Sequence, residues 1–146
     1  MFENPRKLPH ILTFTETWFH EGSGRNLPDY RAYHTFRHSA RSGGVSVYVN
    51  DKIPSQLVEE MPFSNNCIEV CTVEIQLNSK KYFIVAIYRP HSGTISSFVS
   101  ALSQLLDNHN IKSNINLLMG DFNINLLSHD PPILQFVKKL QSFNFP

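Results

Sequence analysis

The sequence lacks any apolar run approaching the ~20 residues that a membrane-spanning helix needs. Its first ten residues contain two prolines and no apolar core, so they do not resemble a secretory signal. Internal repeats and low-complexity segments are also missing. With 146 residues, of which 41% are hydrophobic and 17% charged, we expect one globular domain, or a large part of one, without a membrane partner.

Cysteine is scarce, since only Cys67 and Cys71 are present. If both lie on one strand, four residues at ~3.3 Å each place them ~13 Å apart. A disulfide needs Cα atoms within ~7 Å, so the two cannot bridge each other. We expect reduced core thiols, which are typical of an intracellular protein. No CxxC pair or His-Cys cluster indicates structural zinc.

An excess of charge of one sign is missing as well, because 13 Lys and Arg residues nearly balance 12 Asp and Glu residues. The overall charge therefore gives no argument for nucleic-acid binding. The local distribution does, since residues 25–41 are basic and residues 51–74 are acidic. The basic segment contains Arg25, Arg31, Arg37 and Arg41. We expect these arginines to lie beside the functional site and contact DNA phosphates, with a solvated loop as the alternative.

Hydrophobic spacing predicts a mixture of strands and helices. Strands are expected at 11–15, 45–49, 67–77, 82–88 and 114–119, with a further possible strand at 30–36. One helix is expected at 95–106, with Thr94 as its N-cap, and a second begins at the two prolines 131–132. The second helix is expected to bury Ile133, Leu134, Val137 and Leu140. Segment 53–61 is compatible with a short helix or a loop.

The most informative stretch is 114–123. Its apolar run, ended by Gly120, is typical of a strand that is buried on both faces. Asp121 and Asn123 follow, and two such positions of an extended chain point to the same side. Gly120 has no Cβ, so backbone or a ligand can approach closely there. The alternative interpretation is a strand followed by an ordinary polar turn.

Two other predicted strands end in the same way. Glu16 directly follows the first strand, and Tyr88 and Arg89 close the strand at 82–88. Sites in α/β sheets gather outside strand ends, so we expect these side chains to converge. Carboxylates and an amide suit a hard cation such as Mg²⁺, and Tyr88, Arg89 and Asn123 could donate hydrogen bonds to a phosphate. Taken singly, Glu16 could be a solvated strand end and Tyr88 a core-edge tyrosine.

Four motifs occur in order along the chain. They are Thr-Glu-Thr-Trp at 15–18, Gly-Gly-Val-Ser-Val-Tyr-Val at 43–49, Tyr-Arg-Pro at 88–90 and Gly-Asp-Phe-Asn at 120–123. Together they resemble the endonuclease/exonuclease/phosphatase superfamily, which has the fold of deoxyribonuclease I. Three of them, Thr-Glu-Thr-Trp, Tyr-Arg-Pro and Gly-Asp-Phe-Asn, are most similar to the endonuclease domain of non-LTR retrotransposons. The resemblance implies an α/β (α+β) fold, a two-sheet sandwich flanked by helices, with residues 1–146 as one domain that is incomplete at both ends.

The resemblance also implies an activity and partners. It implies a DNA endonuclease that nicks target DNA by hydrolysing phosphodiesters with Mg²⁺ or Mn²⁺. The domain would be monomeric, act in the nucleus and be fused to a reverse transcriptase in the parent protein. Glu16 resembles the metal-binding glutamate, and Asp121 the aspartate that orients or deprotonates the attacking water. Asn123 resembles the amide that holds this water, and Tyr88 the tyrosine that contacts the scissile phosphate, whereas Arg89 matches no family role.

Two parts of the family pattern are missing. The family's first strand carries a supporting Asn, and Asn4 has no strand pattern around it. The family's late Ser-Asp-His segment has no counterpart before Pro146. Two alternative functions therefore stay open: a phosphatase of the same superfamily, and a non-catalytic remnant that binds nucleic acid.

Because the Ser-Asp-His segment is missing, we expect the 146-residue chain to nick plasmid DNA only slowly with Mg²⁺. Acid–base and electrostatic groups of this kind contribute ~10² to 10⁴-fold each. The measurement compares this chain, a version extended past Pro146, and the Asp121→Ala variant. Equal nicking by the first two, abolished by Asp121→Ala, would show that the catalytic set is complete within these residues.

Overall fold

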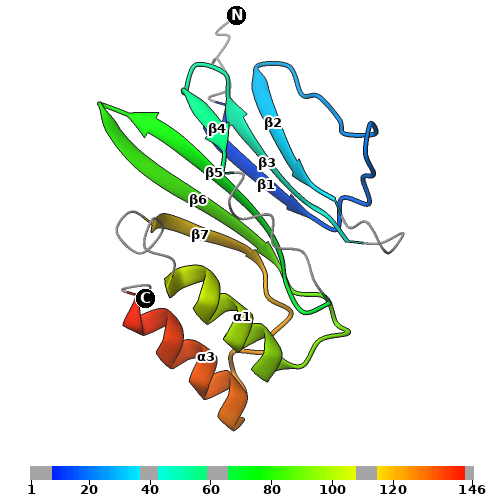
Figure 1. Cartoon of the computed structure of the whole chain (residues 1–146), viewed down its shortest axis with the longest axis vertical. Coiled ribbons are helices and arrows are strands. Elements are labelled where there is room, and N and C mark those ends of the chain that lie inside the picture. The colour runs from blue at the N-terminus through cyan, green and yellow to red at the C-terminus, as the bar shows by residue number, and fades with distance from the viewer. Residues whose placement is uncertain (1–7, 37–42, 59–65, 108–114, 144–146) are drawn as a thin grey trace, which may run out of the picture.

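Two β-sheets and a layer of helices stack on one another in the computed structural model, which describes residues 8–36, 43–58, 66–107 and 115–143 (Figure 1). The first sheet is antiparallel and contains β1 (Ile11–Thr15), β3 (Val45–Asn50) and β2 (Tyr30–Thr35) in that order. The second sheet contains β4 (Ser55–Leu57), β5 (Glu69–Leu77), β6 (Lys80–Tyr88) and β7 (Ile115–Asp121) in that order. Its strands are antiparallel except for the parallel pair β6–β7. Helices α1 (Ile95–Asp107) and α3 (Pro131–Ser142) cover its outer face. The predicted two-sheet sandwich with flanking helices is confirmed.

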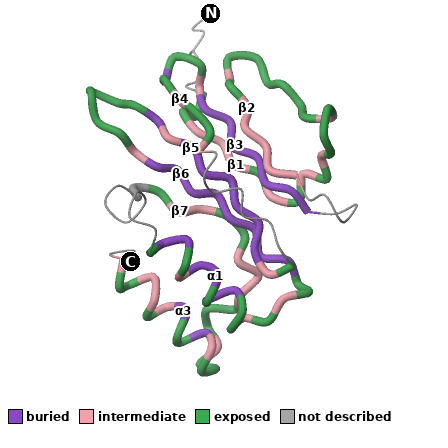
Figure 2. Tube along the Cα trace, in the orientation of Figure 1, coloured by how far each residue is buried: buried purple, intermediate pink, exposed green. Residues whose placement is uncertain are grey.

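The second sheet separates two apolar cores. Val45, Val47 and Val49 point inward from β3, as their period-two spacing predicts, and pack against β5 and β6 between the sheets. On the other face, Phe98 of α1 and Phe136 of α3 pack against β5 and β6. Figure 2 shows this burial concentrated along β3, β5, β6 and the inner side of α1. The central strands β5 and β6 are therefore covered on both faces, which fixes their ends in space.

Most predicted elements form close to their expected positions. The Thr94 hydroxyl accepts a hydrogen bond from the Ser97 amide at 3.1 Å and caps α1, as expected. Segment 53–61 contains the short strand β4 in its described part, so neither a helix nor a plain loop forms there. In α3, the prediction of a buried Leu134 is wrong, because its side chain is 43% exposed. Phe136 is buried in its place.

Strand β7 differs from its prediction in two ways. It continues through Gly120 to Asp121, so the glycine does not end it. It is also not buried on both faces, since Leu117 is 38% exposed. The physical reason is that β7 is the last strand of its sheet in the described residues, where apolar cover is thinner. The expected close approach at Gly120 is confirmed, because a Cβ there would lie 1.8 Å from the carbonyl oxygen of Ile87 on β6.

The cysteines occupy different environments. Cys71 lies on β5 in the core between the sheets, where burial raises the pKa of its thiol to about 11. Cys67 precedes the strand, and its thiol donates a hydrogen bond to the carbonyl of Ser97 at 3.8 Å. In the described part of the chain, no helix is long and apolar enough to cross a membrane.

Replacing Gly120 by Ala is expected to disrupt the pairing of β6 with β7. The new Cβ would collide with the Ile87 backbone, and the φ of +144° is strained for any side chain. Such overpacking and strain together should lower the free energy of unfolding by about 3 kcal/mol or more, as measured by urea denaturation.

Gly22→Ala is the matched control, because Gly22 also has a positive φ, of 79°, but nothing lies within 4 Å of its added Cβ. We expect that variant to lose only about 1 kcal/mol. Equal losses for both variants would contradict the close approach of β7 to β6.

Candidate active site

Three strand ends meet at one end of the sandwich. Tyr88, the last residue of β6, lies directly opposite Asp121, the last residue of β7. Glu16 follows β1 in the other sheet, and its Oε1 accepts a hydrogen bond from the Tyr88 hydroxyl. Glu16 and Asp121 are exposed, whereas Tyr88 is buried. The structure thus brings two solvent-accessible carboxylates to one buried phenol.

Asn123 reaches the same site through a tight turn. Its φ is +49°, so the chain is not extended there, and strand alternation does not align Asn123 with Asp121. The Asn123 amide N–H donates instead to Asp121 Oδ1 at 2.9 Å, which ties the two residues together. Asn123 Nδ2 donates to the carbonyl of Arg89 at 2.8 Å. The turn that follows β7 is therefore fastened to the end of β6.

Arg89 completes this fastening. Its side chain is buried, and its two terminal nitrogens donate to the carbonyls of Asn123 at 2.9 Å and Gly93 at 2.8 Å. Its amide N–H donates to the carbonyl of Asp121 at 2.9 Å. The expectation that Arg89 donates a hydrogen bond to a DNA phosphate does not fit this arrangement, because the terminal nitrogens of its guanidinium bond backbone carbonyls inside the protein. Arg89 holds the turn that carries Asn123.

Glu69 is a site residue that the sequence analysis missed. It begins β5 directly across from Tyr88, and only 1% of its surface is exposed. Its Oε2 accepts a hydrogen bond from the Gly44 amide at 2.6 Å. The signal was present in the sequence, because Glu69 is a charged residue on the otherwise apolar face of a predicted strand.

Tyr88 is surrounded by negative charge. Burial raises the pKa of Tyr88 far above its usual range, and the hydrogen bond to Glu16 raises it further. The charges of Glu16, Glu69 and Asp121 act in the same direction, because each disfavours a phenolate beside it. Tyr88 therefore stays protonated at neutral pH and is available as an O–H donor.

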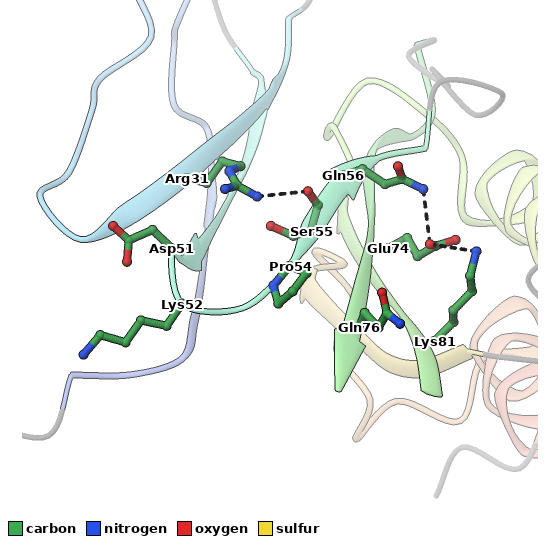
Figure 3. A pocket seen from close by; sticks show the side chains of 9 residues that line it. All are labelled: Arg31, Asp51, Lys52, Pro54, Ser55, Gln56, Glu74, Gln76 and Lys81. Atoms are coloured by element: carbon green, nitrogen blue, oxygen red, sulfur yellow. Dashed lines mark hydrogen bonds and ion pairs between the residues drawn. The ribbon is translucent and has the colours of Figure 1, made fainter. Parts of the chain in front are cut away.

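One arginine of the basic segment, Arg31, does not lie at this site. Arg31 lies near the start of β2, and since β2 runs antiparallel to β3, this is the opposite end of the sandwich. There Arg31 donates to the Ser55 carbonyl at 3.2 Å, beside a hollow of about 540 Å³ that Glu74 and Lys81 also line (Figure 3). The expectation that Arg31 lies beside the active site is wrong for this reason.

Two of the remaining arginines, Arg37 and Arg41, lie outside the described residues. Arg25 is exposed in the loop between β1 and β2, and its carbonyl accepts a hydrogen bond from the Tyr48 hydroxyl at 2.7 Å.

Comparison with known proteins identifies the family. A model described as the Endonuclease/Exonuclease/phosphatase family matches residues 4–141. The chain belongs to this family. A search among curated proteins found no match.

Among solved structures, this family member is similar to the endonuclease domain of TRAS1, a telomere-specific non-LTR retrotransposon. The TM-score is 0.66 at 15% sequence identity, and the match covers 92% of this chain. The chain spans 59% of the length of that domain. At this identity the likeness shows the fold, which agrees with the two-sheet sandwich described above.

The donor set of the site fits one type of metal centre. Within the described ranges, no group of three or more His, Cys, Asp or Glu side chains is placed to hold an ion. These residues therefore do not form a metal site in which protein side chains supply all the ligands. Mg²⁺ is commonly held by one or two carboxylates, with water and substrate phosphate as its other ligands. The exposed carboxylates of Glu16 and Asp121 beside Tyr88 fit that type.

Arg89→Met is expected to destabilise the protein. The substitution leaves the partly buried carbonyls of Asn123 and Gly93 without their donor, which should cost about 2–4 kcal/mol in free energy of unfolding. Arg31→Met is the matched control, because exposed Arg31 makes one bond to a carbonyl and should lose less than about 1 kcal/mol. The measurement is urea denaturation of both variants. A near-neutral Arg89→Met would contradict its role in holding the turn.

Proposed function

We propose that this family member hydrolyses phosphodiester bonds of DNA with bound Mg²⁺. The observation that supports the proposal is the meeting of Glu16, Tyr88 and Asp121 at the ends of strands from both sheets. This arrangement combines acceptors for a cation and a water with a neutral donor for a phosphate.

Glu16 would hold the metal ion, and the exposed carboxylate of Asp121 could take part. Bound there, Mg²⁺ supplies positive charge that stabilises the phosphoryl and leaving oxygens. Mn²⁺, which also prefers oxygen ligands, could occupy the same site.

Asp121 would orient the attacking water and accept its proton. Its carboxylate is exposed, and the Asn123 N–H on Oδ1 fixes its orientation. The bond from Asn123 Nδ2 to the Arg89 carbonyl would hold Asn123 within reach of the same water. The amide would support the water and the charge that develops on the phosphate.

Tyr88 would donate its hydrogen bond to a non-bridging oxygen of the phosphate. Its hydroxyl now faces Glu16, and rotation about the C–O bond would redirect the proton to the phosphate. Its raised pKa keeps that proton in place, so Tyr88 acts as a donor and not as a base.

DNA is the substrate we propose, since the similar solved structure is an endonuclease domain of a non-LTR retrotransposon. By the same likeness, we propose that the chain serves in the nicking of target DNA. Such a reaction takes place where the chromosomal DNA is, in the nucleus, and the parent protein would carry a reverse transcriptase.

The test is nicking of supercoiled plasmid by this chain in excess over DNA, so that slow cleavage is visible. Glu16→Gln and Asp121→Asn should each slow nicking on the order of 10²-fold or more, because each removes a charge that acts on the reacting groups. Tyr88→Phe should slow it by a similar factor through loss of the phosphate donor. Chelation of the divalent ion should abolish nicking.

Glu74→Gln is the control, since this carboxylate lies five residues along β5 from Glu69, paired with Lys81 at 3.0 Å. It should leave the nicking rate unchanged. Nicking that survives chelation, or that is insensitive to Glu16→Gln and Asp121→Asn, would overturn the proposal. Faster hydrolysis of a soluble phosphomonoester than of plasmid would favour a phosphatase.

A further inference from the structure

The backbone that carries Glu16 is in an unfavourable conformation. Glu16 has a φ of +52° and Trp18 a φ of +57°, in the left-handed region that side chains rarely adopt. Such residues persist only where surrounding contacts hold them. The loop is held by two backbone bonds, from the Trp18 amide to the Gly43 carbonyl at 2.8 Å and from the Thr17 amide to the Gly44 carbonyl at 3.3 Å.

The two glycines are themselves held by Glu69. The Gly44 amide donates to Glu69 Oε2 at 2.6 Å. A Cβ on Gly43 would lie 2.5 Å from Glu69 Oε1, and one on Gly44 would lie 2.6 Å from Thr17 Oγ1. The pair is therefore packed between Glu69 and the loop of Glu16, with no room for a side chain on either side.

These contacts form a closed ring at the active site. Glu69 holds Gly44, the two glycines hold the loop of Glu16, and Glu16 accepts a hydrogen bond from Tyr88. Tyr88 lies directly across from Glu69 on the neighbouring strand. The ring joins the first sheet to the second at the end where the site lies.

We propose that Glu69 is a positioning residue that sets the place of Glu16, and thereby the affinity of the site for a divalent cation. The inference rests on the metal-binding role of Glu16 proposed above. Burying a carboxylate is costly, and an apolar side chain often serves stability as well or better. A carboxylate is useful here because it makes a charge-assisted bond to a backbone N–H that no apolar side chain could hold.

The test measures Mn²⁺ binding to the intact 146-residue chain by electron paramagnetic resonance, without substrate. Glu69→Met removes the acceptor at nearly constant volume and should weaken Mn²⁺ binding by roughly tenfold or more, as loss of an outer-shell partner does. Glu69→Gln keeps an acceptor for the Gly44 amide and should stay within about threefold of the unmodified chain. Glu74→Met, five residues further along the same strand, is the control and should not change the affinity.

A second readout needs no metal. Trp18 is the single tryptophan and lies two residues after Glu16, so its fluorescence anisotropy reports the order of the loop. Glu69→Met should lower this anisotropy, and Glu69→Gln and Glu74→Met should not. If Glu69→Met keeps both the Mn²⁺ affinity and the anisotropy, the positioning role is overturned.

The outcomes separate this inference from the proposed function. If Glu16→Gln leaves Mn²⁺ binding intact, the metal role of Glu16 fails, and with it the claim that Glu69 tunes metal affinity. If Glu16→Gln abolishes binding, the Glu69 variants decide the inference alone. If Glu69→Met fails to fold, amide hydrogen exchange of the unmodified chain, measured by NMR, tests the positioning role instead. The amide protons of Gly44 and Trp18 should exchange slowly with solvent, and fast exchange would overturn the proposal.

Discussion

The close approach of two backbones at Gly120 is the constraint on which the site depends. Because no side chain stands between Gly120 and the carbonyl of Ile87, β7 stays paired with β6 to its end. That pairing brings Asp121 opposite Tyr88 and allows the turn of Asn123 to be fastened to Arg89. Any bulk at Gly120 would part the strands at the point where the functional side chains begin.

The site also concentrates negative charge around a neutral group. Glu16, Glu69 and Asp121 all act on Tyr88, and the charge of each carboxylate raises the pKa of its phenol. Glu69 bonds a backbone amide, and Glu16 accepts a hydrogen bond from the Tyr88 hydroxyl. A divalent cation that bound here would meet negative charge already gathered at the site, which favours cation binding.

Local patterns predicted the elements well because they depend on local physics. The alternating valines of β3 and the Thr94 cap of α1 need no knowledge of distant residues. The end of the sandwich at which a residue lies does depend on the whole fold. Arg31 was expected beside the site, yet antiparallel pairing carries it to the other end. Glu69 was missed because its partner is the backbone amide of Gly44, which is far away in the sequence. The role of Arg89 was misassigned because its partner is a backbone carbonyl of Asn123, in the turn that follows another strand.

The two sheets differ in how they are covered, and this difference bears on local unfolding. The second sheet has an apolar core on each face, whereas the first shares a single core with it. Regions with fewer buried contacts open at a lower free energy than the whole protein. Glu16 belongs to the first sheet's side, and Tyr88 and Asp121 to the second. A sub-global opening of the first sheet would therefore separate Glu16 from Tyr88 and Asp121 while the helices and the second sheet stay folded. Mild denaturant would thus abolish the activity of the site before the whole chain unfolds.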